Sequence, residues 1–282
     1  MRKTGILMPV SSLPSRTGVG EMGAEAYHFL TLLKESGVKI WQILPMNPVG
    51  YGNSPYQPYS SCAGDELYIS LDTLYEEGLL KERPEGFHEY ATKVDYDAVR
   101  LHKEPYLREA FQAFLTSGGC ETKDYQEFAA QSWVYEYGAF RALKKANGGC
   151  CWNEWKQEDK MWPDARTDLA PELETEVQYH MFLQYVFFSQ WMKLKEKANA
   201  YDIQIMGDVP FLCGGRFCGR VGIKRQFPSG YRRKADLYCR SSAGLFQCYR
   251  SEMGQSNLQL GIFKRKQLSV LGGPDRIQQQ AV

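Results

Sequence analysis

Two short apolar runs with a helical segment between them constrain the fold of this chain more than any other feature. The runs, residues 5–10 and 38–44, have the length of buried strands. Between them, residues 25–36 place apolar side chains on one face at helical spacing, and Gly37 follows as a natural helix terminator. Strand, helix and strand in this order predict parallel strands joined by a right-handed crossover. The sequence therefore predicts an α/β protein.

Further along the chain, helical segments lead to a third strand. Residues 66–175 predict several helices, including 106–116 and 125–146, which we expect to form a helical insertion. A long helix over about 175–200 then leads into the apolar run 203–211, which predicts another buried strand. A chain of 282 residues has room for one large α/β barrel or for two smaller domains.

A loop rich in proline, glycine and asparagine follows the second predicted strand. Residues 45–61 carry three tyrosines and three serines but no charged side chain. Flat faces and hydroxyls suit a neutral, polyhydroxylated ligand such as a sugar, although an ordinary surface loop has the same composition. We expect Tyr51, Tyr56 and Tyr59 to be better placed for stacking on a ligand than Trp41, which lies inside a predicted strand.

Asp208 is the sharpest single candidate for chemistry. It lies where an apolar strand ends, and the carboxyl ends of strands face the active site in parallel α/β barrels. A carboxylate there can orient a sugar hydroxyl or tune a neighbouring acid. The alternative is an aspartate that caps the next helix or pairs with a buried arginine.

The sequence lacks the residue patterns that several classes of function require. The four histidines have no ligand-like spacing, so we expect no metal site. No glycine-rich phosphate loop follows a strand, and no Gly-x-Ser-x-Gly elbow occurs before residue 211. Polar side chains interrupt the apolar segment 177–192, which indicates a buried helix and no membrane span. The apolar run near the amino terminus is too short for an export signal, so we expect a cytoplasmic protein.

The formal net charge of +1 hides a division of the chain at residue 211. Residues 1–211 carry 30 acidic and 21 basic side chains, whereas residues 212–282 carry 3 acidic and 13 basic ones and four of the eight cysteines. We expect residues 212–282 to be an aberrant, unstructured tail. The basic clusters 232–234 and 264–266 leave open the alternative that this tail binds nucleic acid, but the near-neutral whole chain argues against such a partner.

Six tracts between residues 5 and 211 follow one another in a recognisable order and spacing. They are residues 5–15, 41–45, 50–57, 94–99, 182–185 and 206–210. Together they resemble the 4-α-glucanotransferases (amylomaltase or disproportionating enzyme) of glycoside hydrolase family 77.

The resemblance implies a (β/α)8 barrel with inserted subdomains that acts on α-1,4-glucans and maltooligosaccharides without a metal or organic cofactor. It implies a retaining double displacement, in which a carboxylate attacks the anomeric carbon and an acid protonates the departing sugar. Retention needs these two carboxyl groups roughly 5–5.5 Å apart. The 4-hydroxyl of a second sugar then resolves the glycosyl-enzyme in place of water.

Matching positions carry over substrate contacts but no catalytic residue. The substrate-binding residues that the resemblance implies are Tyr51, Asn53, Ser54, Tyr56 and Asp208. The family's nucleophile, general acid/base and stabilising aspartate come from later barrel strands, and nothing in the tail resembles those strands. We therefore expect about three barrel strands within residues 1–211, a helical insertion over about 66–175, and a chain without activity. A non-catalytic glucan-binding fragment is the alternative.

We predict that residues 212–282 arise from a shifted reading frame. The genetic code allows residues 212–222 to be written so that dropping the first base yields Tyr-Val-Ala-Asp-Asp-Ser-Ala-Asp-Val-Trp. This peptide resembles what the family carries directly after its Gly-Asp-x-Pro motif. Sequencing of the gene around codon 211 should reveal glucanotransferase-like coding in the neighbouring frame. An unshifted gene without such coding would establish a genuine basic tail.

Overall fold

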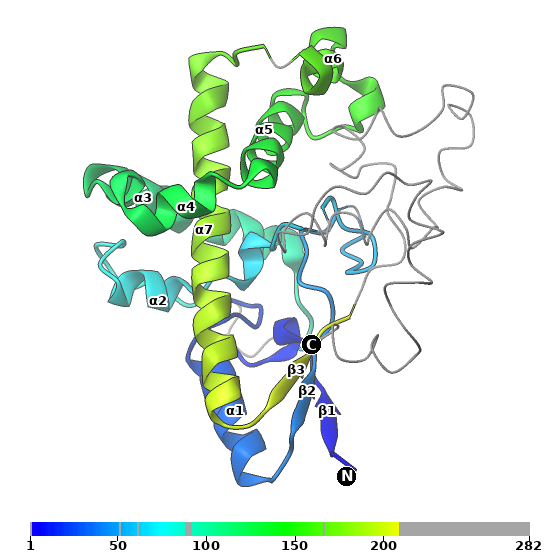
Figure 1. Cartoon of the computed structure of the whole chain (residues 1–282), viewed down its shortest axis with the longest axis vertical. Helices are drawn as coiled ribbons and strands as arrows, with labels where there is room; N and C mark the ends of the chain where they lie inside the picture. Colours follow the sequence, from blue (N-terminus) through cyan, green and yellow to red (C-terminus); the bar gives the residue numbers. More distant parts are fainter. Residues whose placement is uncertain (1, 51, 61, 88–91, 166, 209–282) are drawn as a thin grey trace, which may run out of the picture. The chain divides into compact units, whose positions relative to one another are not determined.

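The computed structural model describes residues 2–50, 52–60, 62–87, 92–165 and 167–208 (Figure 1). The predicted tail, 212–282, lies outside the described residues. Three strands are present in the described part: β1 (Gly5–Leu7), β2 (Ile40–Gln42) and β3 (Gln204–Met206). Its α-helices are α1 (Ala24–Glu35), α2 (Leu71–Glu76), α3 (Tyr96–Thr116), α4 (Lys123–Ala129), α5 (Ser132–Ala146), α6 (Gln157–Ala165) and α7 (Pro171–Ala200).

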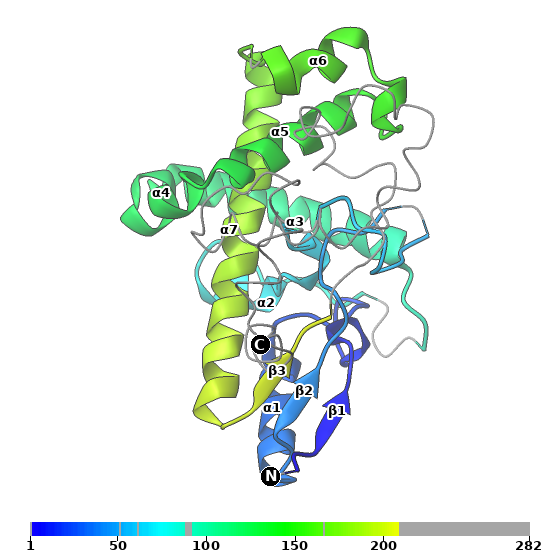
Figure 2. The ribbon, with the colours of Figure 1, turned by 45° about the vertical axis from the view of Figure 1, so that its right-hand side comes forward.

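The three strands form one parallel sheet in the order β1-β2-β3, as the strand–helix–strand pattern predicts (Figure 2). Their carboxyl ends are in register, because Leu7 pairs with Gln42 and Gln42 pairs with Met206. The ladder continues one step beyond the strands, since Met8 N–H donates to Gln42 O and Ile43 N–H donates to Met206 O, both at 2.9 Å. The ends of all three strands therefore lie along one edge of the sheet.

The strands are shorter and less buried than the apolar runs predict. In β1, Ile6 is 37% and Leu7 55% exposed, and Met206 in β3 is 38% exposed. The central strand buries Trp41 completely, and the Trp41 ring packs against Phe29 of α1 at 5.1 Å. In β3 the middle residue, Ile205, is buried and its two neighbours are exposed, whereas β1 has no buried side chain.

Two helices differ from their predicted limits. Asp95 caps α3 by accepting a hydrogen bond from Ala98 N–H, so this helix begins at Tyr96 and accommodates Pro105 in its interior. The predicted helix over 125–146 is two helices, α4 and α5. Gly37 terminates α1 in the left-handed conformation with φ of 71°, as predicted.

The chain divides into two compact units. The first comprises Met1–Met46, Gly64–Ala130 and Phe182–Asp208, and the described part of the second comprises Asn47–Ala63 and Gln131–Met181. The sheet and the second half of α7 belong to the first unit. The second unit contains α5, α6 and the loop that follows β2. The predicted boundaries, a barrel over 1–211 with an insertion over 66–175, stay a prediction.

A buried ion pair ties α3 to the loop that precedes α1. Lys103 is 1% exposed, and its ammonium donates to Glu21 Oε2, Leu67 O and Ile69 O, each at 2.7 Å. Thr17 Oγ1 donates to the same Glu21 oxygen at 2.8 Å. All three ammonium protons are thus satisfied, which is the condition under which a buried charge is tolerated.

Replacement of Lys103 by methionine should destabilise the protein by about 3–5 kcal/mol, because it leaves the Glu21 carboxylate buried without its cation. Urea denaturation should show this as a lower midpoint. Lys123→Met is the control, since the Lys123 ammonium is exposed and pairs with Glu127 at 3.6 Å on the surface. Equal midpoints for the two variants would contradict the structural role of the buried pair.

His102 directly precedes Lys103 on α3, and one of its ring nitrogens is unsatisfied in the described structure. Its ring stacks on Phe87 at 4.5 Å and meets Tyr106 edge-on at 5.4 Å, and Nε2 is buried without a hydrogen-bond partner. Burial lowers the pKa of His102, and the nearby Lys103 lowers it further, against the raising effect of the Glu85 backbone. The folded protein therefore favours the neutral form of the His102 imidazole.

Because the pKa of His102 is lower folded than unfolded, its contribution to stability is present above the ordinary value of 6.5 and is lost as pH falls through the folded value. Thermal unfolding measured between about pH 7.5 and 5 should show this acid destabilisation. His102→Phe keeps a ring against Phe87 but cannot titrate, so it should flatten the pH dependence. An unchanged profile would mean that other groups cause it.

Candidate functional site

The candidate residues follow the carboxyl ends of two neighbouring strands. Asp208 comes two residues after β3 and is half-buried. The loop 47–63 follows β2 through residues 43–46. In parallel α/β sheets this edge is where functional side chains gather. Both elements follow neighbouring strands in the sheet, and their role in a site stays a prediction.

The loop 47–63 is closed by its own backbone and polar side chains. Val49 and Pro58 form an antiparallel bridge, and Tyr59 N–H donates to Pro48 O at 2.8 Å. Nearer the base, Asn47 Nδ2 donates to Ala63 O at 2.9 Å. These contacts join the two sides of the loop in its described part.

The tip of the loop contains the loop residues that the sequence analysis predicts to bind substrate. Asn53 adopts a left-handed conformation with φ of 50°, which asparagine tolerates better than most residues, and its N–H donates to Gly50 O at 3.1 Å. Asn53 and Ser54 are half-buried, whereas Tyr56 is 37% exposed. The fourth predicted loop residue, Tyr51, lies outside the described residues.

Tyr59 does not behave as expected. Its ring packs against Phe140 of α5 at 6.3 Å between centroids, and the Lys144 ammonium lies 5.1 Å above it. A side chain at Gly50 would come within 2.9 Å of the same ring. Tyr59 therefore fastens the loop to α5, and the expectation that it stands free for stacking is wrong.

Lys144 is a residue that sequence reasoning missed. It is buried, and its ammonium donates to Gly149 O at 2.6 Å and to Cys150 O at 3.0 Å, while Trp155 Nε1 donates to Cys150 O at 3.2 Å. The lysine joins the segment after α5 to the face that holds Tyr59. The i, i+4 spacing of Phe140 and Lys144 on α5 is the signal that could have found it.

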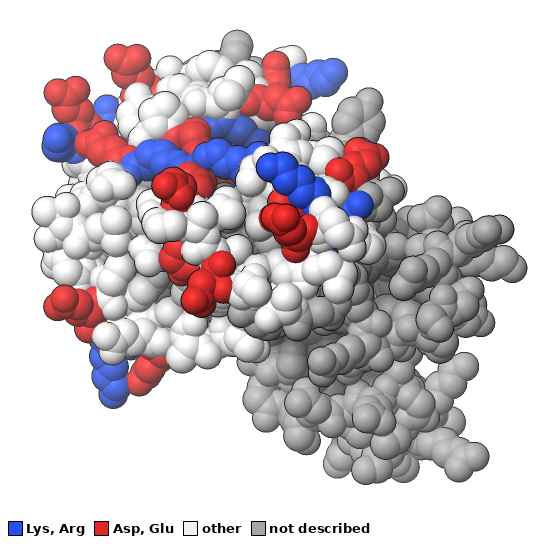
Figure 3. Space-filling model, turned by 90° about the horizontal axis from the view of Figure 1, so that it is seen from above, with Lys and Arg blue, Asp and Glu red and all other residues white. Residues whose placement is uncertain are grey.

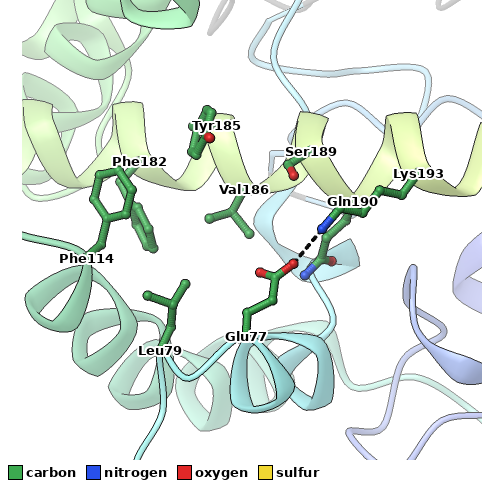
Figure 4. A pocket seen from close by; sticks show the side chains of 9 residues that line it. All are labelled: Glu77, Leu79, Phe114, Phe182, Tyr185, Val186, Ser189, Gln190 and Lys193. Carbon is green, nitrogen blue, oxygen red and sulfur yellow. Dashed lines mark hydrogen bonds and ion pairs between the residues drawn. The ribbon is translucent and has the colours of Figure 1, made fainter. Parts of the chain in front are cut away.

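The first unit also contains a separate pocket of about 250 Å³ (Figure 4). Its apolar end is formed by Leu79, Phe114, Phe182 and Val186. At the other end Lys193 Nζ donates to Glu77 Oε1 at 2.6 Å, and this hydrogen bond raises the pKa of Lys193. None of the predicted site residues lines this pocket, so it is distinct from the candidate site.

The described residues were compared with the needs of three other functions, which are binding of a charged partner, metal binding and membrane spanning. Figure 3 shows acidic and basic side chains interspersed on the face that it draws. Among the described residues, no cluster of three or more His, Cys, Asp or Glu side chains could hold a metal ion. No helix in the described ranges is both long and apolar enough to cross a membrane.

The structure brings Asn53, Ser54 and Tyr56 together on one loop. Asp208 belongs to the other unit, so its place in a common site with this loop stays a prediction. What the described residues define is a class: an α/β protein with parallel strands, whose central strand leads into a loop closed by its own hydrogen bonds.

Comparison with known proteins identifies the family. A family model described as 4-alpha-glucanotransferase, glycoside hydrolase family 77, matches residues 8–216, and the chain therefore belongs to this family. The chain is 41% identical over 217 residues to a 4-alpha-glucanotransferase of Thermus thermophilus, covering 74% of the chain and 42% of the relative. It is 42% identical over 221 residues to that of Synechocystis, covering 74% and 43%.

Solved structures confirm the fold. An amylomaltase from Streptococcus agalactiae in complex with acarbose matches with a TM-score of 0.74 and 31% identity, covering 80% of this chain and 47% of that one. A Corynebacterium glutamicum amylomaltase, 14% identical with a TM-score of 0.56, covers 79% and 32% and shares the fold. The chain spans less than half the length of these relatives. Its described fold is a partial (β/α)8 barrel with three parallel strands.

Proposed function

We propose that this chain supplies glucan-binding groups for the transfer of an α-1,4-glucan segment to the 4-hydroxyl of an acceptor glucose or maltooligosaccharide, by retaining double displacement. The observation that carries the proposal is the closed loop 47–63 at the carboxyl end of β2, in a chain that belongs to the 4-alpha-glucanotransferase family. A loop closed by its own hydrogen bonds suits this reaction, because a held acceptor sugar must outcompete water for the glycosyl-enzyme.

The tip of the loop has the groups that a neutral sugar requires. The Asn53 amide and the Ser54 hydroxyl can each donate and accept hydrogen bonds, which matches the dual character of sugar hydroxyls. The exposed ring of Tyr56 offers an apolar face to the C–H side of a pyranose. Asp208 would orient a hydroxyl from the neighbouring strand. All of these act by binding and orienting substrate.

The displacement itself needs a carboxylate nucleophile and an acid roughly 5–5.5 Å apart. We assign neither to residues 2–208, and no catalytic residue is proposed in this chain. We expect the 282-residue protein to bind maltooligosaccharides without turning them over, whereas its relatives are named for the transfer reaction.

Titration calorimetry with maltotriose and with acarbose tests the loop. Tyr56→Ala should weaken binding about three- to tenfold, the effect of losing one aromatic contact. Tyr75→Ala is the matched control, because Tyr75 is 40% exposed on α2 in the other unit, and it should leave the affinity unchanged.

The outcomes are separable. Equal affinities of the wild type and the Tyr56 variant would show that the Tyr56 ring does not contribute to glucan binding. Glucose release or chain disproportionation from maltotriose above a heat-killed control would contradict the inactivity of the isolated chain.

A further inference from the structure

The loop 47–63 begins directly after Met46 and ends directly before Gly64, both of which belong to the first unit. Asp65 N–H donates to Met46 O at 2.8 Å, so the backbone is pinned directly before and after the excursion. The residue that joins the loop to this closure is Gly64. Whatever holds Gly64 therefore determines where the loop ends.

One side chain satisfies both backbone groups of Gly64. The Gln184 amide on α7 accepts from Gly64 N–H at 2.8 Å through Oε1 and donates to Gly64 O at 2.9 Å through Nε2. Gln184 is 1% exposed, so water cannot replace either bond. A side chain at residue 64 would come within 2.2 Å of the Phe187 ring, so only glycine allows α7 to approach this closely.

We propose that Gln184 is a positioning residue for the glucan-binding loop, an inference that rests on the proposed function where it concerns glucan. From Gly64 the chain passes directly to Ala63, whose carbonyl accepts from Asn47 Nδ2 and whose N–H donates to Ser60 Oγ at 3.2 Å. Both sides of the loop base thus depend on where Gly64 is held. Loss of the amide would leave two buried backbone groups without partners and release the loop end.

The chain contains a natural control for this proposal. Gln190, six residues along α7, is 2% exposed and makes the same two bonds to Ser70, 2.8 Å from Ser70 N–H and 3.1 Å to Ser70 O. Ser70 precedes α2 and caps it, accepting from Thr73 N–H. The two glutamines are therefore chemically equivalent, but only Gln184 adjoins the loop.

The experiment compares Gln184→Met and Gln190→Met in the 282-residue chain, since methionine keeps the volume and removes the amide. Both variants should lose similar stability in urea. Hydrogen exchange read by mass spectrometry should quicken about tenfold or more within residues 47–63 in Gln184→Met only. The maltotriose dissociation constant should rise about tenfold in the same variant and stay at the wild-type value in Gln190→Met.

Gln184→Leu guards against a failure of the methionine variant to fold. It is another uncharged side chain without the amide, so its loop exchange should match that of Gln184→Met. Equal loop exchange in the Gln184 and Gln190 variants, or loop exchange at the wild-type rate in Gln184→Leu, would overturn the proposal. Another outcome is that loop exchange is faster in Gln184→Met than in the wild type while the wild type itself does not bind maltotriose. That result would leave the positioning role standing and refute the proposed function.

Discussion

The contact on which the described structure most depends is the pairing of α7 side chains with the backbone of residues 64–70. A chain segment without helix or strand neighbours must still satisfy its buried N–H and C=O groups. Gln184 and Gln190 do this at Gly64 and Ser70 with both ends of their amides, as a neighbouring strand would. Because the partners are six residues apart on both segments, one helix holds the whole stretch in a single register. The position of the loop and the start of α2 both follow from it.

The parallel sheet supplies the other constraint. Its register brings Leu7, Gln42 and Met206 to one edge, and everything that follows these residues begins from the same place. A loop that starts there can bring polar groups to a site without disturbing the sheet behind it. The exposed side chains of β1 contrast with the buried Trp41 of the central strand, on which α1 packs.

Patterns that depend on local chemistry were predictable from the sequence. Apolar spacing predicted α1, Gly37 predicted its end, and strand–helix–strand alternation predicted parallel pairing. The order of six tracts predicted the family. Contacts between distant residues were not predictable, because a single sequence does not say which partners meet. Tyr59 looked like a ligand platform until Phe140 and Lys144 were seen against it. Within the predicted site, Asn53, Ser54 and Tyr56 share a loop, and the role of Asp208 beside them stays a prediction.

The residues that sequence reasoning missed share one property: they are polar and buried. Lys103, Lys144 and Gln184 look like surface residues by type, yet each satisfies backbone carbonyls or amides that no helix or strand serves. A loop suited to a sugar must present hydroxyls and amides at its tip, so it cannot be held by apolar packing along its whole length. Its order has to come from polar contacts at the base, where water is excluded and each bond is costly to lose. The buried Gln184 amide, which satisfies both backbone groups of Gly64 next to the loop, is such a contact.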